Sequence, residues 1–160
     1  MRPGIKRNKM KRFSLLLALV SFSGMAQQKS IDQKVDDLLA KMTIEEKVGQ
    51  LNQYSGDNTV TGPLTINPNK EQEIKEGKIG SLLNILGAQY TRQYQELAMQ
   101  SRLKIPLLFG LDVVHGYKTT FPIPLAESAS WDLPAIELAA RVAARETAAS
   151  GIHWTFAPMV

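Results

Sequence analysis

The sequence predicts an α/β protein with a parallel β-sheet. Over residues 79–160, short apolar segments of strand length alternate with amphipathic helical segments, in the order strand, helix, strand, helix, strand. This alternation requires crossover connections, which place successive strands side by side and parallel. Two folds fit the pattern, a doubly wound open sheet and a (β/α)8 barrel.

The N-terminus has the layout of a secretory signal peptide. Basic residues at positions 9–12 precede an apolar core, Phe13–Phe22, and the small residues Gly24 and Ala26 suit cleavage after position 26. Met10 is an alternative start. Because a membrane span needs about 20 apolar residues, the core is too short to be an anchor. We therefore expect an exported protein, periplasmic or extracellular, with no membrane span after cleavage.

The charge distribution gives no indication of nucleic-acid binding. The formal net charge is +4, but six of the 19 basic residues lie in the first 26 positions, which contain no acid. The remaining residues, 27–160, carry 13 basic and 15 acidic side chains. They offer no basic stretch interleaved with aromatic residues, so no nucleic-acid partner is expected. The chain has no cysteine and must be stable without disulfides.

Two consecutive helices are predicted at the start of the mature chain. The segment Ser30–Met42 has apolar residues on one helical face, and Ser30 and Gln33 have the spacing of a capping box. A second capping box, Thr43 with Glu46, indicates that a new helix begins at once.

The middle of the chain supplies two predicted strands and two helices. Ser55–Asn69 is rich in Gly, Pro and Asn and is predicted to be a loop. The further elements are a short polar helix at Lys70–Gly77, a strand at Ile79–Leu86, a helix at Thr91–Arg102 and a buried strand at Ile105–Asp112.

The last predicted helix and strand complete the alternation. Pro134–Ser150 reads as a helix, because Pro134 suits a first turn and Gly151 suits a stop. The apolar segment His153–Val160 follows as a third strand.

A carboxylate and an imidazole follow the second predicted strand. Functional side chains of parallel α/β folds gather where strands end, and Asp112 is at such an end, with His115 three residues later. A carboxylate there can accept hydrogen bonds from neighbouring hydroxyls of a sugar. From spacing alone, a ligand-binding and a loop-capping Asp112 are equally supported, and a structural His115 is favoured over one that contacts ligand.

Four further side chains have either a functional or a structural role to play around this site. Trp131 and Trp154 could stack on a sugar face, but packing is favoured for both. Glu127 is favoured as a solvated loop acid over an acid/base group. Asp132 is expected to cap the helix that contains Pro134 in its first turn.

The sequence predicts neither a metal site nor a cofactor. Its two histidines, His115 and His153, are far apart in the chain, and there is no thiol and no HxH or HExxH spacing. A GxSxG nucleophile motif and a glycine-rich phosphate loop are also missing from these 160 residues.

Four segments together resemble glycoside hydrolase family 3, the secreted β-glucosidase and β-xylosidase type. They are LLAKMTIEEKVGQL (38–51), IKEGKIGSLLN (74–84), SRLKIPLLFGLDVVHGYKTTFPIPLA (101–126) and AARETAASGIHWTFAPMV (143–160). They occur in the family's order and cover most of residues 31–160. The resemblance implies that residues 27–160 are the N-terminal part of a TIM-like (β/α)8 barrel, truncated before the barrel is complete.

The resemblance also implies a function and a site. It implies a retaining β-glucosidase that hydrolyses terminal β-D-glucosyl residues without a cofactor, with carbohydrate as its substrate. Asp112 would hold hydroxyls of the sugar in the −1 subsite, and His115 would organise the loop. The family's nucleophile and acid/base lie beyond Val160, so the chain is expected to contain no catalytic residue and to be inactive alone.

Two alternatives stay open, a β-xylosidase of the same family and a small non-enzymatic sugar-binding α/β module. The sequence carries no signal for the oligomeric state.

Overall fold

The computed structural model describes residues 29–56 and 67–158. The chain divides into two compact units, residues 1–40 and 41–160. In the first unit, helix α2 (Ile31–Leu39) begins at the predicted capping box: Ser30 Oγ accepts from the Gln33 N–H at 3.2 Å, and Gln33 Oε1 accepts from the Ser30 N–H at 3.0 Å. The predicted signal peptide lies outside the described residues.

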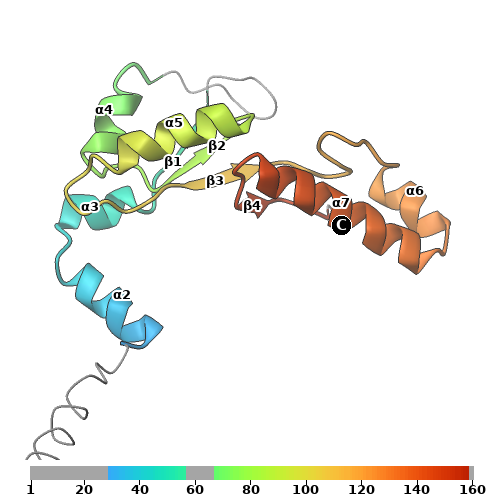
Figure 1. Ribbon diagram of the computed structural model, residues 1–160, viewed down its shortest axis with the longest axis horizontal. Helices are drawn as coiled ribbons and strands as arrows, with labels where there is room; N and C mark the ends of the chain where they lie inside the picture. The colour runs from blue at the N-terminus through green and yellow to red at the C-terminus, as the bar shows by residue number, and fades with distance from the viewer. Residues whose placement is uncertain (1–28, 57–66, 159–160) are drawn as a thin grey trace, which may run out of the picture. The chain divides into compact units, whose positions relative to one another are not determined.

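The second unit is built on a parallel sheet with the strand order β1-β2-β3-β4. The strands are β1 (Gln53–Ser55), β2 (Ser81–Leu83), β3 (Leu108–Leu111) and β4 (Trp154–Thr155). All three neighbouring pairs are parallel, so each connection carries the chain back to the same end of the sheet. The predicted α/β class with a parallel sheet is therefore confirmed (Figure 1).

Strand β1 was not predicted, because the sequence pattern indicated three strands and a loop from Ser55. In the structure, Gln53–Ser55 pairs in register with Ser81–Leu83 of β2. The strand has only three residues, none of them aliphatic, and none of them is fully buried. The apolar run that identified the other strands is therefore missing here, and only pairing with β2 defines the strand.

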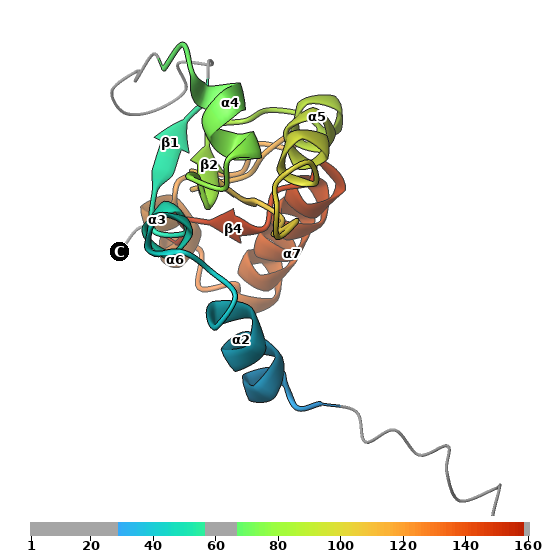
Figure 2. The same ribbon diagram turned by 90° about the vertical axis from the view of Figure 1, so that its left-hand side faces the viewer.

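Helix α3 (Ile44–Gly49) precedes β1. The connections between the strands of the second unit carry the helices α4 (Lys70–Lys75), α5 (Ala88–Ala98), α6 (Pro124–Ala129) and α7 (Leu133–Ala149). Helices α5 and α7 lie along the same side of the sheet in both ribbon views (Figures 1 and 2).

The helix ends follow the local chemistry of the sequence. At the start of α3, Thr43 Oγ1 accepts from the Glu46 N–H at 3.2 Å, and Glu46 Oε2 accepts from the Thr43 N–H at 2.8 Å. Asp132 caps α7 as predicted, accepting from the Ala135 N–H at 3.1 Å. Helix α7 ends before Gly151, which has a φ of +79°.

Helix α6 corrects the prediction that Glu127 lies in a loop. The segment has six residues and follows a proline-rich stretch, so it carries too few positions for a helical pattern to be recognised. Pro124 occupies the first turn, where its missing N–H is harmless and its fixed φ favours the helix.

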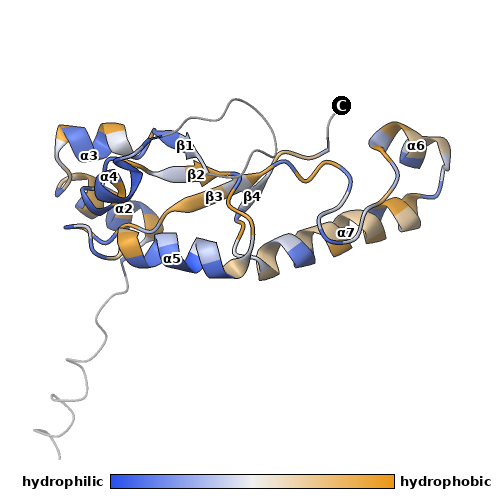
Figure 3. Ribbon diagram, turned by 90° about the horizontal axis from the view of Figure 1, so that it is seen from above, coloured by the Kyte–Doolittle hydropathy of each residue, from blue (hydrophilic) through white to orange (hydrophobic). Residues whose placement is uncertain are grey.

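The hydrophobic core lies between the sheet and its helices. Its members are Ile74, Ile79, Leu82, Ile85, Ala98, Leu107, Phe109, Leu111, Val113 and Ile152. Strand β3 supplies the centre of this core, and hydrophobic residues concentrate along it (Figure 3). The strand was predicted to be buried on both faces, but Leu108 is 53% exposed, whereas Phe109, Gly110 and Leu111 are buried.

Candidate functional site

The carboxyl ends of the four parallel strands form one edge of the sheet, and this edge carries Asp112. The residues that directly follow the strands are Gly56, Asn84, Asp112 and Phe156. Among these four, Asp112 is the only acid, and it is half-buried. The structure therefore places Asp112 where functional groups of parallel α/β folds gather.

Asn84, which directly follows β2, is a buried residue that stabilises this edge of the sheet. Its side chain is fully buried, and its backbone N–H donates to the Gly110 carbonyl at 3.1 Å, which ties the end of β2 to β3. Its φ is +62°, a left-handed conformation that asparagine tolerates better than most residues. The predicted strand Ile79–Leu86 extended past this residue, whereas β2 ends at Leu83.

The loop Val114–Phe121, which follows Asp112, is closed at its base by His115. The Phe121 N–H donates to the His115 carbonyl at 2.8 Å, and His115 Nδ1 lies 2.9 Å from the Phe121 carbonyl. Because a carbonyl only accepts, Nδ1 carries the proton of this bond. These contacts agree with the expectation that His115 organises the loop.

A tight turn shapes the same loop. Gly116 forms a bridge with Thr120 and has a φ of +111°. A Cβ atom at Gly116 would lie 2.0 Å from the Thr119 carbonyl oxygen, so only glycine fits this close approach.

Glu146 of α7 anchors the tip of the loop, and the sequence analysis missed it. Its Oε2 accepts from the Lys118 and Thr119 N–H groups at 2.8 Å each, and its Oε1 accepts from the Thr119 hydroxyl at 2.6 Å. The bonds from Thr119, followed by the backbone bond from Lys118, hold the pKa of Glu146 below its ordinary value of 4.5. No local pattern signals this residue, because it lies 27 positions from Thr119.

Trp131 and Trp154 differ in how much of each side chain is buried. Trp131 was predicted to pack, but it is 90% exposed and has a φ of +54°, so that prediction is wrong for this structure. Trp154 contacts Phe156 with ring centroids 4.7 Å apart and remains 47% exposed. How much of a tryptophan side chain is exposed depends on which residues pack against it in the folded protein, and the local sequence does not determine this.

Glu127 lies on α6, rather than in the expected loop, and lines a mostly apolar cavity of about 240 Å³. Val113 and Phe121 line one part of this cavity, and alanines of α7 line another. Asp112 is not among the lining residues, so the structure does not bring Asp112 and Glu127 together at this cavity.

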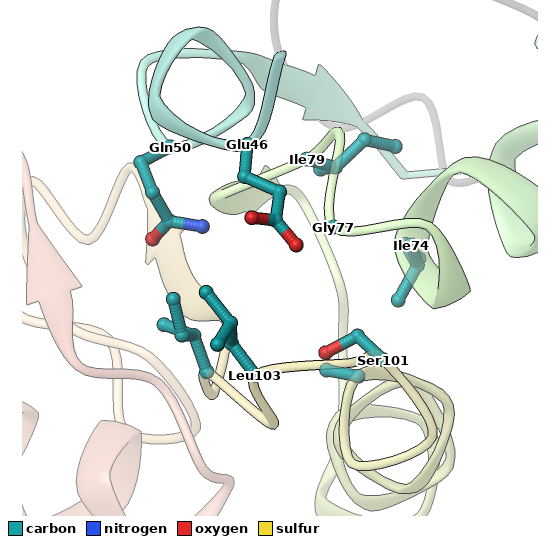
Figure 4. Close-up of a pocket in the computed structure, with 9 residues that line it drawn as sticks. Glu46, Gln50, Ile74, Gly77, Ile79, Ser101 and Leu103 are labelled. Atoms are coloured by element: carbon teal, nitrogen blue, oxygen red, sulfur yellow. The ribbon is translucent and has the colours of Figure 1, made fainter. Parts of the chain in front are cut away.

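A small hollow lies at the opposite, amino end of the strands. Figure 4 shows Glu46, Gln50 and Ser101 around a space of about 10 Å³, which holds about one water. Arg102 donates to Glu46 through Nε at 3.0 Å and Nη2 at 2.5 Å, and this pairing holds the pKa of Glu46 below its ordinary value. The hollow is too small for a sugar, so we assign this end of the sheet to stability.

Metal binding and membrane insertion also concern the described ranges, 29–56 and 67–158. Within them, no group of three or more His, Cys, Asp or Glu side chains is placed to hold a metal ion. The helices described there are too short or too polar to cross a bilayer.

Comparison with known proteins identifies the family. Residues 43–160 match the family described as "Glycosyl hydrolase family 3 N terminal domain". The periplasmic β-glucosidase of Salmonella typhimurium is 45% identical over 130 residues, which covers 81% of this chain and 16% of that protein. The lysosomal β-glucosidase of Dictyostelium discoideum is 32% identical over 154 residues, covering 81% of this chain and 19% of that protein.

A solved structure supports the same assignment. The crystal structure of a β-glucosidase from Listeria innocua in complex with isofagomine superposes with a TM-score of 0.70 at 39% identity, covering 82% of this chain and 18% of that one. The chain thus spans less than a fifth of the length of each of these three proteins. The predicted fold, the N-terminal portion of a TIM-like (β/α)8 barrel, is confirmed by this match and by the parallel sheet. Because the family match covers residues 43–160, the chain belongs to glycosyl hydrolase family 3 and carries its N-terminal domain sequence.

Proposed function

We propose that this chain is the first part of the barrel domain of an exported, retaining β-glucosidase that hydrolyses terminal β-D-glucosyl residues. Family membership supports the glycosidase class, and the names of the relatives described above favour glucosides over xylosides. The periplasmic location in the name of the Salmonella relative supports export, with residues 1–26 as the signal peptide.

Asp112 is the substrate-binding residue in this proposal. The observation that carries it is the position of Asp112: it is the one acid directly after the four strands, and it is half-exposed at their carboxyl edge. An ionised carboxylate accepts through two oxygens, which suits adjacent hydroxyls of a glucosyl ring in the −1 subsite. The role is binding rather than covalent catalysis.

The catalytic pair is proposed to lie outside these 160 residues. Retaining hydrolysis needs two carboxyl groups about 5–5.5 Å apart, and inverting hydrolysis needs them about 6.5–9.5 Å apart. Of the acids near Asp112 in sequence, Glu127 lines a cavity that Asp112 does not reach, and Asp132 is engaged with the Ala135 N–H. Coverage of less than a fifth of the relatives leaves ample sequence for the missing groups.

The test compares the complete coding sequence that contains this chain with residues 27–160 alone. Aryl β-glucosides and aryl β-xylosides serve as substrates. We expect turnover, with glucoside preferred, from the complete protein and none from residues 27–160. Activity of residues 27–160 that survives purification would overturn the placement of the catalytic pair.

Asp112→Asn tests the site within the complete protein. Each charge-assisted hydrogen bond to a sugar hydroxyl contributes about 1.5–3 kcal/mol, so kcat/KM should fall by about 10- to 150-fold. Asp132→Asn is the matched control, because asparagine also caps helices well and Asp132 serves only α7. Equal kinetics for the two variants would reduce Asp112 to a loop cap. A complete protein that binds glucose-like inhibitors but hydrolyses nothing would support the sugar-binding module instead.

A further inference from the structure

We propose that Glu146 is a positioning residue for the candidate sugar site, because its carboxylate holds the tip of the loop Val114–Phe121 that follows Asp112. The part of this inference that concerns sugar rests on the proposed function. The part that concerns the loop rests on the contacts of Glu146 alone.

Hydrogen bonds to Glu146 connect the loop to helix α7. Three donors from two adjacent loop residues, the N–H groups of Lys118 and Thr119 and the Thr119 hydroxyl, converge on the two oxygens of one carboxylate at 2.6–2.8 Å. The acceptor comes from α7, a 17-residue helix whose buried residues include the neighbouring Thr147. The loop tip is therefore fixed to a regular element of the unit rather than to another loop.

The arrangement needs a carboxylate rather than an amide. Both oxygens of an ionised glutamate accept, so all three donors are satisfied at once. A glutamine at position 146 would keep one acceptor oxygen and direct its NH2 group at the remaining donors. The hydrogen bonds from Thr119 lower the pKa of Glu146, which agrees with a group that stays ionised where the loop must be ordered, and the Lys118 ammonium contributes in the same direction.

The contacts of Glu146 are connected to the candidate site by a short loop with internal hydrogen bonds. The tip residues Lys118 and Thr119 are enclosed by the Gly116–Thr120 bridge and by the His115–Phe121 bonds at the base. His115 lies three residues from Asp112. Because these contacts link the tip to the base of the loop, we expect release of the tip to loosen the base as well, and with it the segment that borders the Asp112 carboxylate.

The loop half of the inference is tested by amide hydrogen exchange on the 160-residue chain. In Glu146→Gln, the Lys118 and Thr119 amides should exchange about 10-fold faster or more, as expected for loss of hydrogen bonds to a charged acceptor. Glu137→Gln is the matched control. It makes the same chemical change on the same helix, but Glu137 pairs with Arg141 of α7 and contacts no loop donor that the structure describes.

The site half is tested by kinetics of the complete protein on an aryl β-glucoside. Glu146→Gln should raise KM about 10-fold or more with a smaller change in kcat, because a mobile loop weakens sugar positioning before chemistry. Thr119→Val, on the exposed tip, should reproduce part of this effect without affecting the core. The double variant should fall short of the product of the two single effects, since both remove the same contact.

Each outcome decides the inference. Unchanged Lys118 and Thr119 exchange in Glu146→Gln would overturn the anchor. Faster exchange with unchanged KM would show that the loop is held but does not position substrate, and the positioning role would fail. If the wild-type protein hydrolyses no glycoside, the proposed function fails, and the exchange measurement still decides whether Glu146 holds the loop.

Discussion

Gln95 offers the sharpest test of how strand β3, which leads to Asp112, is held in place. Its side-chain amide forms two hydrogen bonds with the backbone of Leu107, as a neighbouring strand would. Nε2 donates to the Leu107 carbonyl at 2.8 Å, and Oε1 accepts from the Leu107 N–H at 2.9 Å. Leu107 is 2% exposed and directly precedes β3. Gln95→Ala would leave both backbone groups without this partner.

The magnitude follows from the two lost bonds. A buried donor or acceptor left unsatisfied costs about 1–3 kcal/mol, so two such groups set a range of about 2–6 kcal/mol. Gln95 is only half-buried, and a shorter side chain admits water to the exposed groups. We therefore expect the lower part of the range, a loss of about 2–3 kcal/mol in the free energy of unfolding.

Gln95→Glu separates the hydrogen bonds from the loss of side-chain volume. The carboxylate keeps an acceptor for the Leu107 N–H but directs a second acceptor at the Leu107 carbonyl, which destabilises the variant at neutral pH. A protonated glutamic acid can donate to that carbonyl. The stability deficit of this variant should therefore shrink as the pH is lowered until its carboxyl is protonated.

Urea unfolding followed by circular dichroism measures both variants. With a slope of about 1–3 kcal/mol per molar urea, a loss of about 2–3 kcal/mol in Gln95→Ala should lower the midpoint by about 0.7–3 M. Gln100→Ala is the control, because Gln100 makes one 3.3 Å bond to the Glu96 carbonyl of its own helix region and should change stability by less than about 0.5 kcal/mol. Equal effects of the two alanine variants would refute the reasoning.

The remaining predictions concern a salt bridge and a pair of glycines. Arg102 lowers the pKa of Glu46 below 4.5, so the stability that this carboxylate contributes is present above pH 4.5 and is lost as the pH falls through the lowered value. Glu46→Gln should be less stable than wild type at pH 7, and the difference in urea midpoint should vanish in acid; a difference that persists there would contradict the pairing. Gly151→Ala should destabilise more than Gly77→Ala in the same assay. The two glycines have similar positive φ values, +79° and +73°, which cost alanine about 1–2 kcal/mol, but a Cβ at Gly151 would lie 2.4 Å from Thr91 Oγ1, whereas the nearest atom to a Cβ at Gly77 is Glu46 Cγ at 3.6 Å. Equal losses would show that the Thr91 contact relaxes freely.

Local chemistry explains the elements that the sequence predicted well. The capping boxes of α2 and α3 and the Asp132 cap of α7 each depend on residues three positions apart, so they are readable without knowledge of the fold. Strand β3 was recognised because an apolar run bounded by polar residues has few other stable placements. Asp112 was placed for the same reason, since it directly follows that run.

The elements that were missed lack such local signals. Strand β1 has no aliphatic residue and is defined by its pairing with β2. Helix α6 is too short to show a helical period. The exposed state of Trp131 and the location of Glu127 on α6 both depend on how the segment after Asp112 turns, which its proline-rich sequence left undetermined.

The sequence by itself determined the family, the alternation of strands and helices, and the position of Asp112 at a strand end, because these depend on motifs and on periods shorter than one helix or strand. Tertiary structure alone decided which distant groups meet. Glu146 contacts a loop 27 positions away, Gln95 pairs with a backbone 12 positions away, and Arg102 contacts Glu46 across 56 positions. A carboxylate or amide on a helix has the same local sequence whether it faces solvent or an unpaired N–H group, and only the packing of strands and helices brings that N–H group within 3 Å.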